Sequence, residues 1–405
     1  MKISNTFVFK FFVVILCTSL FTGLMPSLGM SYCIGAAGQK NLPEDDVVHI
    51  KTAEQLAAIG GEGSEGKYYV LDNDINLIDE WVPIEDFNGT FDGQGYTINN
   101  LYVLESSNIR YAGLFGATYY GGGLIIKNVG VHISSKGVNS AVPSGVAFAG
   151  GLIGYSGVDV TVENSYVTGD VVAITSGDSL NYDGAYAGGL IGLISGVTVI
   201  ENSYTTSNVV ATSVRAYIGA YAGGLVGHNN GDPISGFGVV TVANSYVTGD
   251  ITATSTWGYA YAGGLIGHMQ GSITAVNSYA TGDISANSSG HNAYAGDLVG
   301  YTDGSVDVSS CYSLSTQKII GDATNAVGVI LTPEEMRTKE SFIGWDFETV
   351  WVINSKINEG YPYLKSLVPH DTGWPFGFIA LTAVVIMLIT MGVIYVLLKN
   401  SRSHS

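Results

Sequence analysis

Carboxylates are the residues of this sequence best suited to chemistry. Asp74, Glu85, Asp86 and Asp92 fall in one short stretch, and two of them could act as general acid and general base, as in sugar-cleaving enzymes. Asp92, however, stands in Phe-Asp-Gly-Gln-Gly, where an Asp usually bonds its own backbone in a turn. We therefore assign no catalytic residue and keep a carboxylate pair as the alternative.

A second set of carboxylates recurs at one position of a repeated unit. Asp170, Asp250 and Asp283 each follow Thr-Gly. Stacked in register, they could offer oxygen ligands to calcium. An Asp after Gly in a turn more often bonds its own backbone, and the Gly is expected to take a positive φ. No metal or cofactor site is assigned.

Histidine and tyrosine recur in the same way. His228 and His268 each follow the last Gly of a repeated segment; two imidazoles are too few for a metal site, so an exposed stacked pair is expected. A row of tyrosines is either a stripe that stacks on sugars or a packed corner of the fold. The row consists of Tyr166, Tyr204, Tyr246 and Tyr279. Asn88 and Asn287 begin N-glycosylation sequons.

These positions are equivalent because the sequence repeats. A segment close to Ala-Gly-Gly-Leu-Ile-Gly occurs at 149–154, 187–192, 222–227 and 262–267. It returns in altered form at 295–300, and a divergent first copy lies at 111–116. A second block, Asn-Ser-Tyr, follows at 164–166, 202–204, 244–246 and 277–279, and as Ser-Cys-Tyr at 310–312. The blocks are 15 residues apart in four copies and 22 in the copy at 222, where 231–237 is inserted. The insertion therefore reads as a surface loop on a repeated structural unit.

The repeated unit is predicted to be β-structure. Segments such as 158–162 and 239–242 are rich in β-branched residues with period-two alternation, and Gly, Asn and Asp bound them. Stacked copies would bring equivalent residues to about 4.8 Å, with Leu, Ile and Val inside, Tyr or Asn at corners, and Gly at sharp turns. The sequence thus predicts an all-β, right-handed parallel β-helix or solenoid. A β-propeller is the rival, but its Trp-Asp type of signature is absent.

The Gly-Leu-Ile-Gly at 151–154 and its copies resemble the GLUG motif. Segments 69–77, 81–84 and 87–98 resemble the opening coils of GLUG-repeat proteins, and 344–347 and 360–364 resemble their close, so the resemblance covers roughly 46–366. It implies a bacterial or archaeal surface protein of the adhesin type. Such repeats also accompany immunoglobulin-A-cleaving metallopeptidases, but no His here is followed by Glu, so the zinc motif His-Glu-x-x-His is missing and that activity is not implied.

A solenoid needs capped ends, because an open coil exposes strand edges and apolar core. Thr52, with Gln55 three residues on, predicts a short capping helix over 52–59. At the other end, Thr332 before Pro333 and Glu334 predicts a helix start with Met336 facing the stack.

Both ends of the chain read as membrane signals. The first 37 residues combine Lys2 and Lys10 with an apolar run, as in a secretory signal peptide; an uncleaved anchor is the alternative. The uncharged stretch 373–398 is long enough for one transmembrane helix, and the following Lys399 and Arg402 place the tail inside. A sortase-like segment precedes it at 368–373, but its Pro-to-Thr spacing departs from the motif, so a retained helix is favoured.

Charge and cysteine content exclude several classes. The chain has a net charge of −18; without 1–37 and 373–405 it keeps 12 basic and 34 acidic side chains, a net charge of −22. Nucleic acids and anionic lipid surfaces are disfavoured partners of such a surface. Of the three cysteines, Cys17 lies in the predicted signal, and Cys33 and Cys311 do not predict a disulfide framework.

The predicted layout is signal peptide 1–37, N-terminal cap and first coils 38–110, repeat solenoid 111–320, C-terminal cap 321–366, linker 367–372, transmembrane helix 373–398 and cytoplasmic tail 399–405. The predicted role is non-catalytic: adhesion or envelope scaffolding at the cell membrane, with most of the chain extracellular. A glycan or protein ligand would meet the loops 176–186, 213–221 and 231–237. The rival is a polysaccharide-acting enzyme of the pectin-lyase-like β-helix type.

Overall fold

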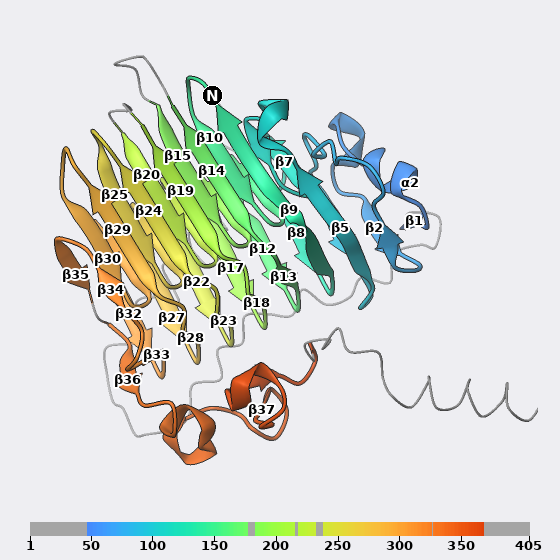
Figure 1. Cartoon of the computed structure of the whole chain (residues 1–405). Coiled ribbons are helices and arrows are strands. Elements are labelled where there is room, and N and C mark those ends of the chain that lie inside the picture. Colours follow the sequence, from blue (N-terminus) through green and yellow to red (C-terminus); the bar gives the residue numbers. More distant parts are fainter. Residues whose placement is uncertain (1–46, 177–182, 215–217, 232–237, 326, 368–405) are drawn as a thin grey trace, which may run out of the picture. The chain divides into compact units, whose positions relative to one another are not determined.

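The computed structural model describes residues 47–176, 183–214, 218–231, 238–325 and 327–367, which belong to one compact unit, 45–405. Their strands pair in parallel, so that each coil of the chain lies on the coil before it (Figure 1). The fold is an all-β parallel β-solenoid of about six turns, as the repeat predicted. The predicted signal peptide, transmembrane helix and tail lie outside the described residues. Within the described residues no helix is long and apolar enough to cross a membrane.

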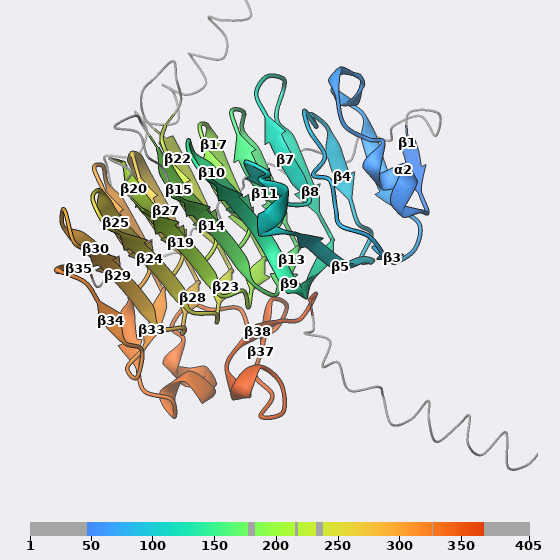
Figure 2. The ribbon, with the colours of Figure 1, turned by 45° about the horizontal axis from the view of Figure 1, so that its top comes forward.

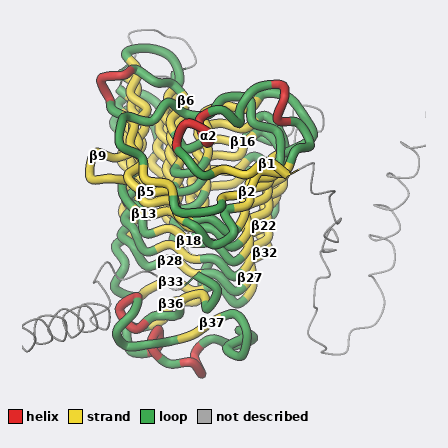
Figure 3. Tube along the Cα trace, turned by 90° about the vertical axis from the view of Figure 1, so that its right-hand side faces the viewer, coloured by secondary structure: helices red, strands yellow, loops and turns green. Residues whose placement is uncertain are grey.

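One coil shows the plan of the others. It runs through β15 (Gly184–Gly188), β16 (Ile191–Ile194), β17 (Val197–Glu201), β18 (Tyr204–Thr205) and β19 (Val209–Ser213). These strands belong in turn to four stacked sheets, which we call D, C, A and B, the last contributing two strands per coil (Figure 2). Figure 3 shows the coils as successive layers.

In the repeat region sheets A, C and D each contain one strand per coil; sheet A also continues into the opening coils, and sheet D has one further strand at the C-terminal end. The nine strands of sheet A are β1 (Val47–Ile50), β2 (Tyr68–Leu71), β4 (Thr90–Asp92), β8 (Leu124–Lys127), β12 (Val160–Glu163), β17, β22 (Gly238–Ala243), β27 (Gly271–Val276) and β32 (Val306–Ser309). Those of sheet C are β7 (Phe115–Thr118), β11 (Ile153–Ser156), β16, β21 (Val226–Asn229), β26 (Ile266–Met269) and β31 (Val299–Thr302). Those of sheet D are β6 (Tyr111–Ala112), β10 (Ala147–Gly150), β15, β20 (Gly219–Gly223), β25 (Tyr259–Gly263), β30 (Ala293–Gly296) and β35 (Ala323–Asn325).

Sheet B contains the row of motif tyrosines, Tyr166, Tyr204, Tyr246 and Tyr279, and we call the edge of the solenoid that they form the tyrosine corner. Its strands are β3 (Ile75–Asn76), β5 (Thr97–Val103), β9 (Gly130–Val142), β13 (Tyr166–Thr168), β14 (Val171–Thr175), β18, β19, β23 (Tyr246–Val247), β24 (Ile251–Ser255), β28 (Tyr279–Ala280), β29 (Ile284–Ser288), β33 (Tyr312–Leu314), β34 (Ile319–Ile320) and β36 (Val329–Leu331). A separate antiparallel pair, β37 (Trp351–Val352) and β38 (Tyr363–Leu364), lies in the C-terminal segment.

The motif leucines form the inner column of the core. Each is fully buried, and each stacks on its equivalent in the next coil because the flanking strands pair in register. They are Leu152, Leu190, Leu225, Leu265 and Leu298. Burying one leucine side chain contributes about 2 kcal/mol, and a single coil could not bury its own. The predicted stacking, with leucine inside, is confirmed.

The motif glycines are required by close packing between sheets D and C. A Cβ on Gly188 would lie 1.9 Å from the Ile191 carbonyl oxygen, and one on Gly192 would lie 2.8 Å from the Ala149 carbonyl oxygen. Neither residue has a positive φ, so the constraint is steric. In the Thr-Gly-Asp turns the expected positive φ occurs at Gly169, but it is wrong for Gly249 and Gly282, which instead approach the backbone of the preceding coil.

The corner between sheets A and B depends on Asn and Ser. Asn164, Asn202, Asn244, Asn277 and Ser310 all take a left-handed φ of 45–50°, which Asn tolerates best among residues with a Cβ. The serine after each Asn is buried; the Ser203 hydroxyl, for example, donates to the Glu201 carbonyl and accepts from the Ser165 backbone N–H. Cys311 replaces this serine in the last coil, and burial raises the pKa of its thiol to about 12.

The predicted N-terminal cap is confirmed. Helix α2 (Ala53–Ala57) begins after Thr52, whose side chain accepts from the Gln55 N–H, while the Gln55 side chain accepts from the Lys51 N–H. Its Leu56 is fully buried against the first coils. The remaining helices of the described residues are single 3-10 turns: η2 (Glu62–Ser64), η3 (Glu105–Ser107), η4 (Glu335–Arg337), η5 (Lys339–Ser341) and η6 (Asn358–Gly360).

The C-terminal segment packs along the side of the solenoid. Thr332 caps η4 by accepting from the Glu335 N–H, and Met336 is buried, as predicted. The segment then covers the tyrosine corner, where Trp345, Trp351 and Leu364 form one buried cluster with Tyr246 and Tyr279. It therefore seals a flank of the stack.

Candidate functional sites on the solenoid

The Asp92 carboxylate is held by four partners. It accepts from the Tyr68 hydroxyl at 2.5 Å, from the Asn128 amide at 3.0 Å and from the Gln94 N–H at 2.9 Å, and Lys127 lies 3.6 Å away. Burial alone would raise its pKa, but these hydrogen bonds and the lysine outweigh burial, so the pKa lies below its usual value. Asp92 is thus an ionised structural acceptor, which agrees with the turn interpretation.

The other acidic candidates are engaged at separate places. Asp74 accepts from the N–H and hydroxyl of Thr97 in sheet B, whereas Glu85 accepts from the Ala117 N–H beside sheet C. Burial raises the pKa of Glu85, and the nearby Asp86 adds to the shift. No hydrogen bond joins any two of these four carboxylates in the described chain.

The repeated aspartates stack as the register predicted. The Asp170 carboxylate accepts from the Asn208 amide, the Asp250 carboxylate accepts from the Asp283 N–H, and the Asp283 carboxylate accepts from the Lys318 N–H. Each side chain therefore bonds the next coil rather than its own turn. Among the described residues no group of three or more His, Cys, Asp or Glu is arranged to hold a metal ion.

The row of motif tyrosines forms a packed corner. The rings of Tyr166, Tyr204, Tyr246 and Tyr279 stack 4.6–5.1 Å apart and within 6° of parallel. The Tyr279 hydroxyl donates to the Pro362 carbonyl at 2.6 Å and accepts from the Asn358 amide. Neighbouring rings thus cover the faces that a stacking sugar would need, and the C-terminal segment packs against Tyr246 and Tyr279.

A second aromatic ladder lies on the outer side of sheets D and C. Its first row comes from sheet D, where successive rings are 4.6–5.3 Å apart. The row is Tyr111, Phe148, Tyr186, Tyr221, Tyr261 and Tyr294. A parallel row from sheet C packs against it: Tyr155, Leu193, His228, His268 and Tyr301, with Tyr119 at its start. We call these two rows the outer aromatic ladder.

Sequence reasoning missed the first row of this ladder. The signal was present, because an aromatic residue stands two positions before the first motif Gly in every copy. The residues on either side of this aromatic residue are fully buried in the core, as Ala185 and Ala187 are beside Tyr186. Because side chains alternate along a strand, Tyr186 points outward. An outward aromatic row normally means exposure, but here the second row covers it.

The two histidines belong to this ladder. Their rings stack with centroids 4.7 Å apart, and the two Nδ1 atoms are 2.9 Å apart. The stacked pair was predicted, but its exposure is wrong: each residue is only 6 % exposed, because Tyr221, Tyr261 and Tyr301 pack around the pair. Burial lowers the pKa of both imidazoles, to about 4 for His268. Both are neutral at pH 7.

The outer aromatic ladder reaches the surface at both ends, and Tyr119 at its start is 40 % exposed. Toward its C-terminal end, Trp257 is 52 % exposed and Tyr259 is 36 % exposed, in and directly after the connection from β24 to β25. The Tyr259 ring lies 4.6 Å from the His291 ring and 6.5 Å from the Tyr294 ring. This cluster places the side chains of Trp257, Tyr259 and His291 at the surface.

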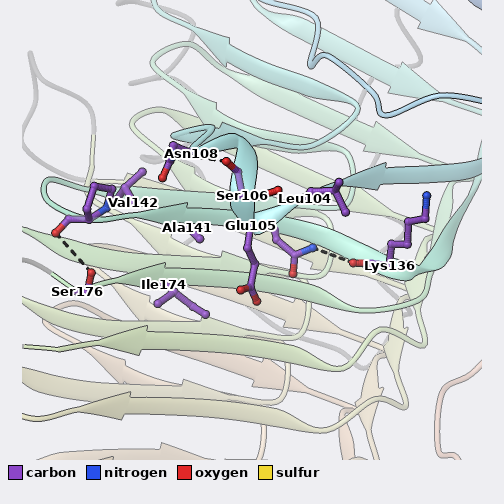
Figure 4. Close-up of a pocket in the computed structure, with 11 residues that line it drawn as sticks. Leu104, Glu105, Ser106, Asn108, Lys136, Ala141, Val142, Ile174 and Ser176 are labelled. Carbon is purple, nitrogen blue, oxygen red and sulfur yellow. Dashed lines mark hydrogen bonds between the residues drawn. The ribbon is translucent and has the colours of Figure 1, made fainter.

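A hollow of about 730 Å³ lies on the outer side of sheet B (Figure 4). Helical turn η3 overhangs it with Glu105 and Ser106, and Ala141 and Ile174 form its floor. Lys136 borders it, but its ammonium stacks on Tyr102 with 3.7 Å to the ring centre. The hollow is open and shallow, with one carboxylate.

The two predicted sequons differ in accessibility. Asn88 is half-buried, and its amide donates to the Tyr120 carbonyl. Asn287 is exposed on β29, and its amide donates to the Ser285 hydroxyl. Glycosylation at either position stays a prediction.

Comparison with known proteins gives one structural likeness. No protein-family model matches the chain, and no curated protein matches it. A crystal structure of a "putative immunoglobulin A1 protease" from Bacteroides ovatus is similar with a TM-score of 0.51 and 20 % sequence identity, over 80 % of this chain and 94 % of that one. At that identity, the likeness supports the β-solenoid fold and carries no activity across.

Proposed function

We propose that this protein is a non-catalytic, cell-surface repeat protein that acts in adhesion or as an envelope scaffold. The stacked coils provide a stiff shaft, and the loops at its edges provide contact surface. In this proposal the C-terminal stretch 373–398 anchors the chain and the solenoid lies outside the cell. The solenoid hand, predicted to be right-handed, belongs to the same proposal.

One observation carries the proposal: the repeats keep the length of two of their connections between sheets, but the length of two other connections varies from repeat to repeat. From 147 onward, two residues always separate a sheet D strand from the following sheet C strand, and two separate a sheet A strand from the following sheet B strand. The connections from sheet B to sheet D instead range from two to eight residues, and those from sheet C to sheet A from one to eight. Repeat proteins often place their binding face at such variable loops.

Both variable corners border the outer aromatic ladder, because sheets D and C lie between them. The predicted contact loops 176–186, 213–221 and 231–237 fall at these corners, and 177–182, 215–217 and 232–237 lie outside the described residues. The net charge of −18 makes neutral or basic partners more favourable than nucleic acids.

The carboxylates support a structural role better than a catalytic one. A glycosidase pair needs two carboxyl groups on either side of one substrate bond. Asp92 is saturated with donors, and Asp74 and Glu85 bond different sheets.

Attachment and turnover can be measured together. Beads coated with the purified full-length chain should adhere to surfaces carrying glycans or extracellular proteins, more than beads coated with albumin, and should release no soluble sugar from polysaccharides. Release of sugar that is lost in Asp92→Asn or Glu85→Gln would overturn the proposal in favour of the polysaccharide-acting enzyme.

A further inference from the structure

The outer aromatic ladder stops at a definite place in the fold. Strand β35 continues sheet D beyond β30, and Ala323 occupies the position that pairs with Tyr294. Sheet C ends at β31, which contributes Tyr301. Both rows of rings therefore end at Tyr294 and Tyr301, and within the described residues no further ring stacks on their outer faces.

The exposed aromatic cluster lies beside this end. Tyr259 connects the two, since its ring is 5.8 Å from Tyr261 inside the ladder and 4.6 Å from His291 outside it. Trp257 stands two residues before Tyr259 in the same connection between sheets B and D. The cluster thus extends the ladder to the surface at the last two coils.

Close backbone packing holds this cluster in place. Gly290, in the connection of the last coil, fits so tightly that a Cβ would lie 2.4 Å from the Trp257 carbonyl oxygen. The connection of the last coil is also tied down, because the Ser288 hydroxyl donates to the Gly258 carbonyl at 2.7 Å. Rings on such a backbone need little ordering when a ligand binds, which favours affinity.

Polar groups lie beside the hydroxyl groups of Tyr294 and Tyr301. The Asn292 amide donates to the Tyr294 hydroxyl at 3.1 Å. Asp303 lies near Tyr301 and raises the pKa of that phenol, chiefly through its charge. Asp322 accepts from the N–H of Ala293, the residue before Tyr294. Hydroxyl, amide and carboxylate groups beside aromatic faces match a ligand with both C–H faces and hydroxyl groups.

We propose that Trp257, Tyr259, Tyr294 and Tyr301 form a binding subsite for an uncharged saccharide. A pyranose ring would stack its C–H face on the exposed aromatic rings, and its hydroxyl groups would bond Asn292 and Asp303. The carboxylates of Asp303 and Asp322 and the acidic chain repel sulfated, sialylated and uronic-acid sugars. This inference rests on the proposed adhesive function and names the ligand class and its place.

The test uses the full-length chain in mild detergent on an array of neutral oligosaccharides built from hexoses, deoxyhexoses and N-acetylhexosamines, with heparin, polygalacturonate and sialyllactose as anionic comparisons. At least one neutral oligosaccharide should bind, and the anionic set should not. Trp257→Ala and Tyr259→Ala should each weaken that binding about tenfold, as loss of one stacked ring predicts.

Tyr120→Ala is the matched control, because Tyr120 is 85 % exposed at the other end of the ladder. It should leave the affinity unchanged, and Trp257→Ala and Tyr120→Ala should both keep the parent's melting temperature, because Trp257 and Tyr120 are each more than half exposed. Absence of binding to every neutral oligosaccharide, or binding that Trp257→Ala does not weaken, overturns the subsite.

The same variants separate this inference from the function on which it rests. If beads coated with Trp257→Ala adhere as the parent does, the adhesive function stands and the saccharide subsite is wrong. A protein ligand whose binding requires Trp257, with no saccharide bound, also overturns the subsite while leaving adhesion in place.

Discussion

Single glycines determine how closely sheets D and C approach. Gly188 and its equivalents in the other copies face backbone atoms of the opposite sheet and of the next coil, at distances that no Cβ could occupy. The motif therefore encodes a close contact between two sheets. The sequence indicated that these glycines matter, but the expected reason was a sharp turn, because a repeat shows which positions are equivalent and not what lies opposite them.

Gly188→Ala should lower the free energy of unfolding by about 3 kcal/mol, since the methyl group would overlap the Ile191 carbonyl and force the sheets apart. Gly63→Ala is the control: its nearest neighbour is the Lys67 ammonium at 4.0 Å, so stability should change little. Urea unfolding followed by circular dichroism measures both. Equal stability of the two variants would mean that sheets D and C are not packed this closely.

The buried histidines predict acid sensitivity. The unfolded chain takes up protons at both imidazoles near pH 6.5, whereas the folded chain resists protonation until about pH 4 at His268 and also well below 6.5 at His228. Stability should therefore fall as the pH drops below 6.5, by up to about 1.4 kcal/mol per pH unit for each histidine. Urea unfolding at pH 7, 5.5 and 4.5 would show it.

The double variant His228→Phe/His268→Phe isolates this effect from titrating carboxylates. Tyr155, Leu193 and Tyr301 occupy the equivalent positions, so the ladder accepts apolar rings there. The variant should lose less stability than the parent between pH 7 and pH 4.5. If the parent and the double variant lose the same stability between pH 7 and pH 4.5, the two histidines are not buried in their neutral form.

At the scale of elements, the ends of the stack follow a different chemistry from its middle. In five copies the residue before the motif leucine is Gly, because the next coil's backbone leaves no space; in the last copy it is Asp297. The buried Asp297 carboxylate accepts from the backbone N–H groups of Leu298, Val327 and Gly328. It thus closes the stack with side-chain hydrogen bonds.

Asp297→Ala should destabilise the protein by about 3 kcal/mol, because three backbone N–H groups lose their acceptor. Asp297→Asn keeps one oxygen and should fall between the parent and the alanine variant. Asp307→Ala, an exposed acid on β32, should be neutral. If Asp297→Ala is as neutral as Asp307→Ala, Asp297 does not close the last coil.

The sequence predicted the local caps but not the long-range one. Thr52 with Gln55, and Thr332 with Glu335, lie within one turn of each other, so their pairing can be read from spacing. The packing of Tyr279 against Pro362 and Asn358 joins residues about eighty positions apart, for which no spacing rule exists. This is why the tyrosine row remained open between a sugar stripe and a packed corner.

At the scale of the whole molecule, one core runs through the described coils, and each coil covers apolar side chains of the next coil. The repeat was sufficient to predict this stacking and its register. It could not show that the variable corners border an aromatic surface, because that surface forms only when sheets D and C fold against each other. The membrane anchor and the signal peptide stay predictions from the terminal sequences.

Distances between spin labels test the stacking most directly. In a chain whose cysteines are replaced by serine, labels would pair position 125 with 199, 241, 274 or 307, which face outward on sheet A in register. At about 4.8 Å per strand, the backbone separations of these pairs are about 10, 14, 19 and 24 Å. The distances between labels measured by electron paramagnetic resonance should increase from pair to pair by the same steps. Separations that do not grow by one strand spacing per repeat would contradict the solenoid.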